Sequence, residues 1–151
     1  MIQKRSTIDP DLYEADETAW LEAMSELIEQ GRVDDLDYPH LSEYLSDMAK
    51  RDRREVISRL VVLIKHALKW TYQPKKRTRS WHSTIVTQQQ DLEDDLSGGV
   101  LRQHAQTNLG LAYSRAVTRA ALETGLRAES FPQECPYTLD QLLTLDIPAI
   151  E

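Results

Sequence analysis

The amino-acid sequence predicts an all-α protein, a single-domain bundle of five to six mostly antiparallel helices. Three observations predict this fold class. Apolar residues recur at the three- and four-residue spacing of helical faces through most of the chain. No segment shows the clean apolar–polar alternation of a half-buried strand. The connections between the expected helices are short, which favours antiparallel neighbours in a bundle.

Length and composition indicate one soluble domain. The 151 residues are 40% hydrophobic and 28% charged, as in ordinary globular proteins. A domain of this size buries roughly 70% of its unfolded surface. No apolar run approaches the ~20 residues of a membrane span, and the N-terminus lacks the apolar region of a signal peptide. Because Cys135 is the only cysteine, an internal disulfide is excluded. We expect a cytoplasmic protein without membrane contact.

Residues 1–151 are expected to form one helical domain, in which residues 1–12 are a flexible N-terminus. Asp16 and Glu17 favour the start of the first helix, and Gly31 favours its end. Its apolar face consists of Trp20, Leu21, Met24, Leu27 and Ile28. Pro39 suits the first turn of the next helix.

A long central helix is expected over about 53–72. Asp52 and Glu55 have the spacing of a capping box, which predicts a break or kink near Lys50. Pro74 ends the helix. Its apolar half consists of Ile57, Leu60, Leu63, Ile64, Ala67, Leu68 and Thr71.

The second half of the chain predicts two further long helices and a short closing one. Ser80 is the expected N-cap of a helix that runs to about Leu96. A loop at 97–99 precedes a helix over 100–124, which Gly125 ends. The helix over 80–96 turns Ile85, Leu92 and Leu96 inward, and that over 100–124 turns Leu101, Ala105, Leu109, Ala112, Ala116 and Ala120 inward. Residues 126–151 form an extended, proline-containing segment and a short closing helix at 138–143, where Thr138 and Gln141 are spaced as a capping box.

Four segments of the chain match a known family. They are YEADETAWLEAMSELI, LKWTYQPKKRTRSW, ETGL and FPQECPYTLDQLL. From about Tyr13 to Leu143 the sequence resembles the bacterial domain-of-unknown-function family 29 (DUF29), although it lacks the glycine expected near Ala49 and Lys50. The resemblance implies an all-helical, single-domain bacterial protein. It implies no activity and no site residues, because none is assigned to the family.

The charges are distributed unevenly along the chain. Residues 1–49 carry 13 acidic and 3 basic residues, residues 50–79 carry 2 and 11, and residues 80–151 carry 10 and 4. The net charge is −7. A basic middle between acidic ends can bind an external anion, or it can pair with the acidic helices of its own chain.

The strongest candidate for a binding site is the segment 65–81, which we call the basic corner. Its candidate residues are Lys65, Lys69, Lys75, Lys76, Arg77, Arg79 and Trp81. Cations neutralise phosphates, and exposed aromatic faces stack on unpaired bases. The alternative is that Trp70 and Trp81 pack into the core while the cations pair internally. The isoelectric point of about 5.1 argues against a dedicated nucleic-acid binder, whose domain usually exceeds ~9.

Weaker candidates for chemistry lie elsewhere. His40, Glu43 and Asp47 share one helical face and can converge on a metal, although a single histidine is more often structural. Cys135 is either a small buried side chain or a thiol activated by a nearby positive charge. The acidic runs at 34–37 and 91–95 offer paired carboxylates for acid–base chemistry, or solvated helix ends.

We therefore predict a non-catalytic cytoplasmic interaction module that contacts a protein partner through the basic corner. A nucleic-acid binding protein that grips the phosphate backbone is the first alternative, and a metal-dependent enzyme is the second. Self-association into a homo-oligomer is also open. We assign no catalytic residues and no cofactor, because the sequence contains no glycine-rich phosphate loop, nucleophile elbow or zinc-binding motif.

Overall fold

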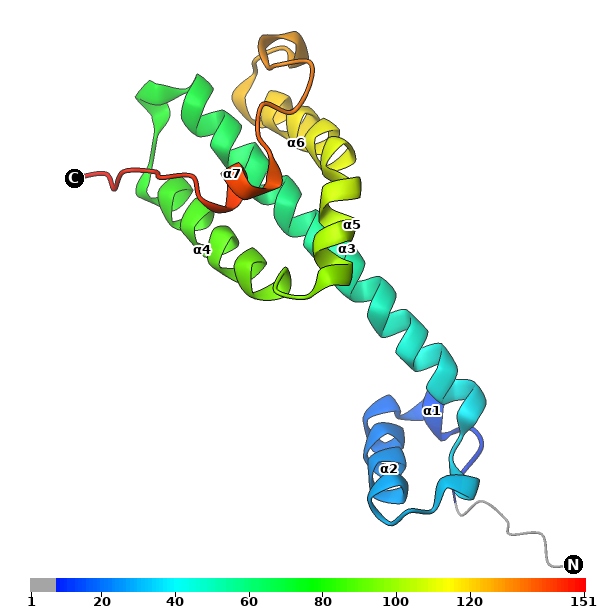
Figure 1. Ribbon diagram of the computed structural model, residues 1–151. Coiled ribbons are helices and arrows are strands. Elements are labelled where there is room, and N and C mark those ends of the chain that lie inside the picture. Colours follow the sequence, from blue (N-terminus) through cyan, green and yellow to red (C-terminus); the bar gives the residue numbers. More distant parts are fainter. Residues whose placement is uncertain (1–7) are drawn as a thin grey trace, which may run out of the picture. The chain divides into compact units, whose positions relative to one another are not determined.

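Helices make up most of the chain described by the computed structural model, which covers residues 8–151 (Figure 1). No strand occurs in these residues, so the predicted all-α fold class is confirmed. The α-helices are α1 (Leu12–Ala15), α2 (Glu17–Glu29), α3 (Tyr38–Tyr72), α4 (Arg79–Asp95), α5 (Gly99–Thr107), α6 (Leu109–Thr124) and α7 (Leu139–Leu143). Short 3-10 helices are η1 (Val33–Asp35), η2 (Pro74–Lys76) and η3 (Ala128–Ser130). Of the predicted flexible N-terminus, residues 1–7 lie outside the described residues, whereas Leu12 already begins α1.

The chain groups into two compact units, Met1–Lys50 and Arg51–Glu151, the first described from residue 8 onward. Each unit has its own apolar core. No helix within residues 8–151 combines the length and the apolarity that crossing a membrane would require.

The first unit is built around α2 and the start of α3. Trp20 is fully buried, and its indole Nε1 donates a hydrogen bond to Asp37 Oδ2 at 3.1 Å. The predicted ends of α2 are confirmed: the Asp16 side chain accepts from the Ala19 N–H, and Gly31 adopts a left-handed φ of 69°. The buried apolar residues of this unit are Trp20, Met24 and Leu27.

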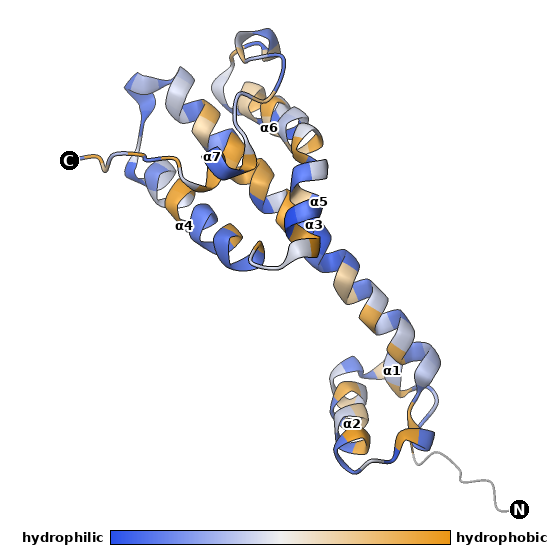
Figure 2. Ribbon diagram, viewed as in Figure 1, coloured by the Kyte–Doolittle hydropathy of each residue, from blue (hydrophilic) through white to orange (hydrophobic). Residues whose placement is uncertain are grey.

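The second unit is organised around the second half of α3. Here α4 runs back along α3, and hydrophobic residues concentrate on α3 between α4 and α6 (Figures 1 and 2). Every residue predicted for its apolar half is buried except Thr71, which is exposed. The buried residues of α3 are Val56, Ile57, Leu60, Val61, Leu63, Ile64, Ala67, Leu68 and Trp70.

The predicted helix break near Lys50 is wrong, because α3 is continuous from Tyr38 to Tyr72. Glu55 does not reach back to cap a new helix. Its carboxylate instead accepts hydrogen bonds from Arg59, one turn further on, at 2.8 and 3.2 Å. No glycine or proline interrupts this stretch, so the backbone bonds of the helix continue. The boundary between the two units nevertheless falls between Lys50 and Arg51.

Two further boundaries differ from prediction. The N-cap of α4 is Thr78 rather than Ser80: the Thr78 backbone is extended, and its hydroxyl accepts from the Trp81 N–H at 3.2 Å. The helix expected over 100–124 is divided at Asn108, whose side-chain amide donates to the His104 carbonyl at 2.9 Å. Asparagine competes in this way for backbone groups inside helices. The division and the short α1 add two helices and the continuous α3 removes one, which gives seven α-helices among the described residues rather than five to six.

The remaining terminators are confirmed. Helix α3 ends at Tyr72 before Pro74, and Gly125 follows α6 with a φ of 76°. Thr138 and Gln141 make both hydrogen bonds of the capping box at α7.

The identity of the α4 cap can be tested with two alanine variants. Thr78→Ala should lower the free energy of unfolding by about 1 kcal/mol, because the Trp81 N–H loses its acceptor. Ser80→Ala, in the exposed first turn, should change it by less than about 0.5 kcal/mol. Urea unfolding followed by circular dichroism measures both, and a larger loss for Ser80→Ala would restore the original assignment.

The left-handed glycine after α6 provides a second test. Gly125→Ala should lower the free energy of unfolding by about 1 kcal/mol, because a Cβ is strained at this φ. Gly110→Ala is the matched control, since its φ is not positive and a Cβ there also meets open space. We expect Gly110→Ala to raise the stability by up to about 1 kcal/mol. Equal effects in thermal melts would contradict the conformational explanation.

Candidate functional site: the basic corner between α3 and α4

The backbone of the basic corner is a tight turn between two long helices. The Gln73 N–H still bonds to the Lys69 carbonyl at 2.9 Å, and the Lys76 N–H bonds to the Gln73 carbonyl at 3.0 Å. Pro74 begins the short helix η2, and Thr78 then caps α4. The segment therefore has a defined conformation rather than the form of an open loop.

The tryptophans of the corner are structural. Trp70 is buried, and Trp81 is half-buried and packs against the core of the second unit. Arg77 fixes the turn, because its Nε donates to the Trp70 carbonyl at 2.9 Å and its guanidinium carbon lies 4.9 Å from the Trp70 ring centre. Lys69 Nζ lies 4.6 Å from the Trp81 ring centre. Neither indole is therefore open for a base to stack on.

Two of the corner lysines are paired within the chain. Lys65 Nζ and Lys69 Nζ each lie 3.0 Å from a different carboxylate oxygen of Glu123 on α6. Their side chains are only 14% and 12% exposed. Partial burial acts to raise the pKa of Glu123, but the hydrogen bonds and charges of the two lysines outweigh it and hold the pKa below 4.5. These lysines tie α3 to α6 rather than facing a ligand.

His66 also belongs to the interior of the corner. Its Nδ1 lies 2.8 Å from the Val62 carbonyl oxygen, one turn earlier on α3. Burial lowers the pKa of His66, and the neighbouring Lys65 and Lys69 lower it further, whereas the Val62 bond opposes the change. The ring is therefore neutral at pH 7.

Arg77 is exposed but is held by the Trp70 carbonyl, and three further cations of the corner have no such bond within residues 8–151. Lys75, Lys76 and Arg79 are exposed, and within residues 8–151 none of them has an acidic partner. Arg59, by contrast, contacts carboxylates of Glu55 and, on α4, of Asp91 and Asp95. The predicted basic corner thus divides into an internal part and an outward part, and only the outward part, Lys75, Lys76 and Arg79, is available to a partner. We call these three residues the outer triad.

The predicted metal candidates are not brought together. His40 Nδ1 lies 2.6 Å from Asp37 Oδ2, and its ring stacks on Tyr13 with centroids 4.4 Å apart. Glu43 and Asp47 make no bond to this histidine. Desolvation is the main cause that raises the pKa of Tyr13, and the negative charges of Glu43 and Asp47 raise it further. Within residues 8–151, no group of three or more His, Cys, Asp or Glu side chains is placed to hold a metal ion.

Cys135 and the acidic runs have structural environments. The Cys135 thiol is half-buried and donates to the Tyr137 carbonyl at 3.3 Å. Burial raises its pKa, so it is a thiol rather than a thiolate at neutral pH. Asp35 pairs with Arg32, and the run at 91–95 supplies partners for Arg59. Asp91 and Asp95 thus link α4 to α3, whereas Asp35 forms its ion pair within its own turn.

A family model described as "Domain of unknown function DUF29" matches residues 12–147. The chain belongs to this family. The match covers nearly the whole chain and confirms the resemblance seen in the sequence. No curated protein and no solved structure matches the chain.

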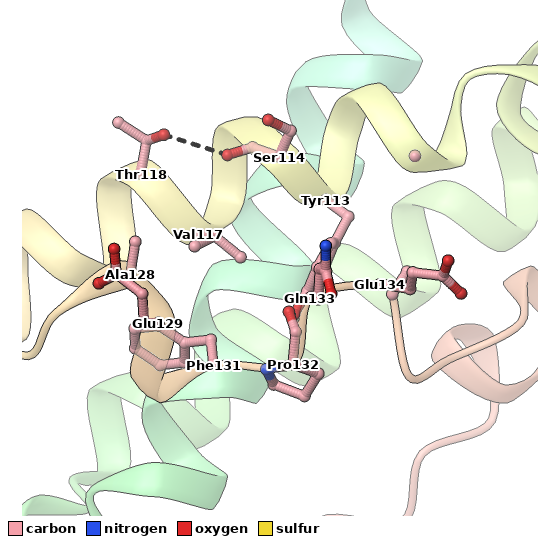
Figure 3. Close-up of a pocket in the computed structure, with 12 residues that line it drawn as sticks. Tyr113, Ser114, Val117, Thr118, Ala128, Glu129, Phe131, Pro132, Gln133 and Glu134 are labelled. Carbon is pink, nitrogen blue, oxygen red and sulfur yellow. Dashed lines mark hydrogen bonds between the residues drawn. The ribbon is translucent and has the colours of Figure 1, made fainter.

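Sequence reasoning missed one feature of this DUF29 protein, a groove between α6 and the segment 128–135. Figure 3 shows its lining residues, and its volume is about 750 Å³. Five residues of α6 line it: Tyr113, Val117 and three small residues at four-residue spacing, Gly110, Ser114 and Thr118. The one local signal of this groove in the sequence was the row of small exposed residues on the side of α6 opposite its buried alanines, Ala112, Ala116 and Ala120. The opposing wall comes from a segment without periodicity, so no sequence pattern marks it.

The pairing of Glu123 can be tested by its pH dependence. Because the folded-state pKa is lowered, its ionisation stabilises the fold above about pH 4.5, and this contribution is lost as the pH falls through the lower folded-state pKa. At pH 7, Glu123→Gln should lower the free energy of unfolding by about 1 kcal/mol. The difference from the unmodified protein should shrink as the pH falls below about 4.5 and Glu123 becomes protonated in the folded state.

The matched control for this experiment is Glu93→Gln, which removes an exposed carboxylate of α4 that has no ion pair among residues 8–151. Denaturant melts from pH 3 to pH 8 measure both variants. A Glu123→Gln effect that is independent of pH, or equal to that of the control, would contradict the assigned ion pairs.

Proposed function

We propose that this DUF29 chain is a non-catalytic helical interaction module that binds an acidic surface of a partner protein through Lys75, Lys76 and Arg79. The observation that carries this proposal is the division of the basic corner. The bundle supplies carboxylates to Lys65 and Lys69 on α3, whereas the outer triad faces solvent without an acidic partner in residues 8–151. Exposed, unpaired cations that lie within five residues of each other in the sequence suit an anionic partner.

Preorganisation of the turn supports a binding role. Pro74, the bond from Arg77 to the Trp70 carbonyl, and the Thr78 cap hold the backbone that carries the outer triad. A partner that binds a preformed turn loses less conformational entropy on association than one that must order a loop. The side chains of the triad supply the charge, and the turn supplies its position.

An acidic protein surface is favoured over nucleic acid as the partner. Nucleic-acid binding commonly combines several phosphate contacts with aromatic stacking platforms. Trp70 is buried, the Trp81 ring is covered by Lys69, and the more exposed Tyr72 packs edge-on against Phe131 at 5.2 Å. Three outward cations in this corner, on a chain of net charge −7, are few for a polyanion.

Binding to defined probes tests the proposal. The probes are a fluorescein-labelled ten-residue glutamate peptide and labelled single- and double-stranded DNA and RNA, each measured by anisotropy at low and near-physiological salt. We expect micromolar to millimolar binding of the peptide that weakens with salt. Reversal of Lys75, Lys76 and Arg79 to glutamate should weaken it at least tenfold.

The matched control reverses Arg115, Arg119 and Arg127, three exposed arginines that change the net charge by the same amount. This control should retain its affinity for the peptide within about threefold. The reversed arginines lie outside the proposed contact and act on the peptide only at long range, where salt screens their charge. Equal losses in both variants, or no peptide binding at low salt, would overturn the proposal. The proposal would be replaced by nucleic-acid recognition if nucleic acid bound more tightly than the peptide and if only the variant that reverses Lys75, Lys76 and Arg79 lost this binding.

A further inference from the structure

We propose that the groove between α6 and the segment 128–135 binds small organic cations that join an apolar body to a positive charge. This site is separate from the basic corner, and the inference does not depend on the proposed function. It rests on three properties of the groove: its size, its apolar floor and the sign of its charge.

The groove has the size and shape of a ligand site. Its volume of about 750 Å³ lies within the roughly 300–1,000 Å³ typical of small-molecule pockets. Gly110, Ser114 and Thr118 lie at successive turns of α6, so this row of the lining carries only small side chains, beside the larger Tyr113 and Val117. The Thr118 hydroxyl donates to the Ser114 carbonyl at 3.1 Å, which Figure 3 shows, so this hydroxyl is already bonded within the helix.

The floor of the groove is apolar and fixed in place. Tyr113 and Phe131 line it and are each only 4% exposed. The Tyr113 hydroxyl donates to the Pro132 carbonyl and thereby holds the segment 128–135 against α6. Val117 and Pro132 add further apolar surface. An aromatic or aliphatic body placed here would bury apolar area against a surface that needs no rearrangement.

The charged side chains in the described lining of the groove are both acidic. Glu129 and Glu134 lie at the groove, both are exposed, and neither has an ion pair within residues 8–151. No lysine or arginine belongs to the described lining. The other two ionisable groups there are neutral at pH 7: desolvation raises the pKa of Tyr113 to about 12, and burial raises that of Cys135. Two unpaired carboxylates beside an apolar floor complement a ligand with an apolar body and an ammonium group.

Three probes with the same body isolate the charge. They are 4-phenylbutylammonium, 4-phenylbutanol and 4-phenylbutyrate, titrated into the full chain with affinity measured by calorimetry and by shifts of backbone NMR signals. We expect the cation to bind most tightly and the anion least, with shifts confined to α6 and 128–135. Failure of the cation to bind at millimolar concentration would overturn the proposal, as would equal affinity for all three probes.

Variants identify the groups responsible. The double variant Glu129→Gln with Glu134→Gln should weaken binding of the cation roughly tenfold, because each exposed charge pair contributes about threefold. Its affinity for the neutral probe should be unchanged. Ser114→Trp, at an exposed position of α6, should weaken all three probes because the indole fills the groove. The matched control is Glu93→Gln with Asp94→Asn, which removes two exposed acids of α4 outside the groove.

The outcomes are separable from those for the basic corner. The variant that reverses Lys75, Lys76 and Arg79 should bind the cation as the unmodified chain does. Circular dichroism confirms that each variant is folded before it is titrated. Cation affinity that is unchanged in the double glutamine variant, or reduced equally in the α4 control, would contradict recognition by Glu129 and Glu134.

Discussion

Burial of the apolar half of α3 is the constraint on which the rest of the second unit depends. Nine side chains between Val56 and Trp70 are buried, and each large apolar side chain removed from water contributes roughly 1.5–3 kcal/mol. One helix cannot bury such a surface by itself. Helices α4 and α6, with α7 and the extended segment, cover it, and the same apolar cluster includes residues from all of them. The path of the chain after Tyr72 follows from this requirement.

The same packing decides the fate of the charges on α3. Lys65, Lys69 and Arg59 emerge at the edge of the apolar half, next to α6 or α4, where an unpaired charge would be partly desolvated. Each of them has a carboxylate partner on the neighbouring helix. Lys75 and Lys76 lie in the turn beyond the end of α3, and there the chain offers no acidic side chain among the described residues. The segment 65–81 therefore contains both lysines that pair within the bundle and lysines that are free to contact a partner.

The two candidate surfaces of the second unit have opposite sign and a common support. The outer triad is positive, whereas the groove beside α6 has two unpaired carboxylates. Tyr72 at the end of α3 packs edge-on against Phe131, which lines the groove. Both surfaces thus rest on residues that belong to the core or touch it. This arrangement keeps their positions defined while leaving their charged groups in solvent.

Local patterns in the sequence by themselves determined the helical fold class, most helix ends and most of the core. Asp16, Pro74, Gly125 and the Thr138–Gln141 box act within about four residues, so their effects can be read from neighbouring positions. Local patterns failed where two compatible signals overlapped: the Asp52–Glu55 spacing also suits a continuous helix, and Thr78 stood two residues before the expected cap. Only the tertiary structure decided which cations are free and where the groove lies. Glu123 reaches Lys65 across 58 residues of sequence, and such pairs form because helix packing, rather than chain proximity, brings the groups together.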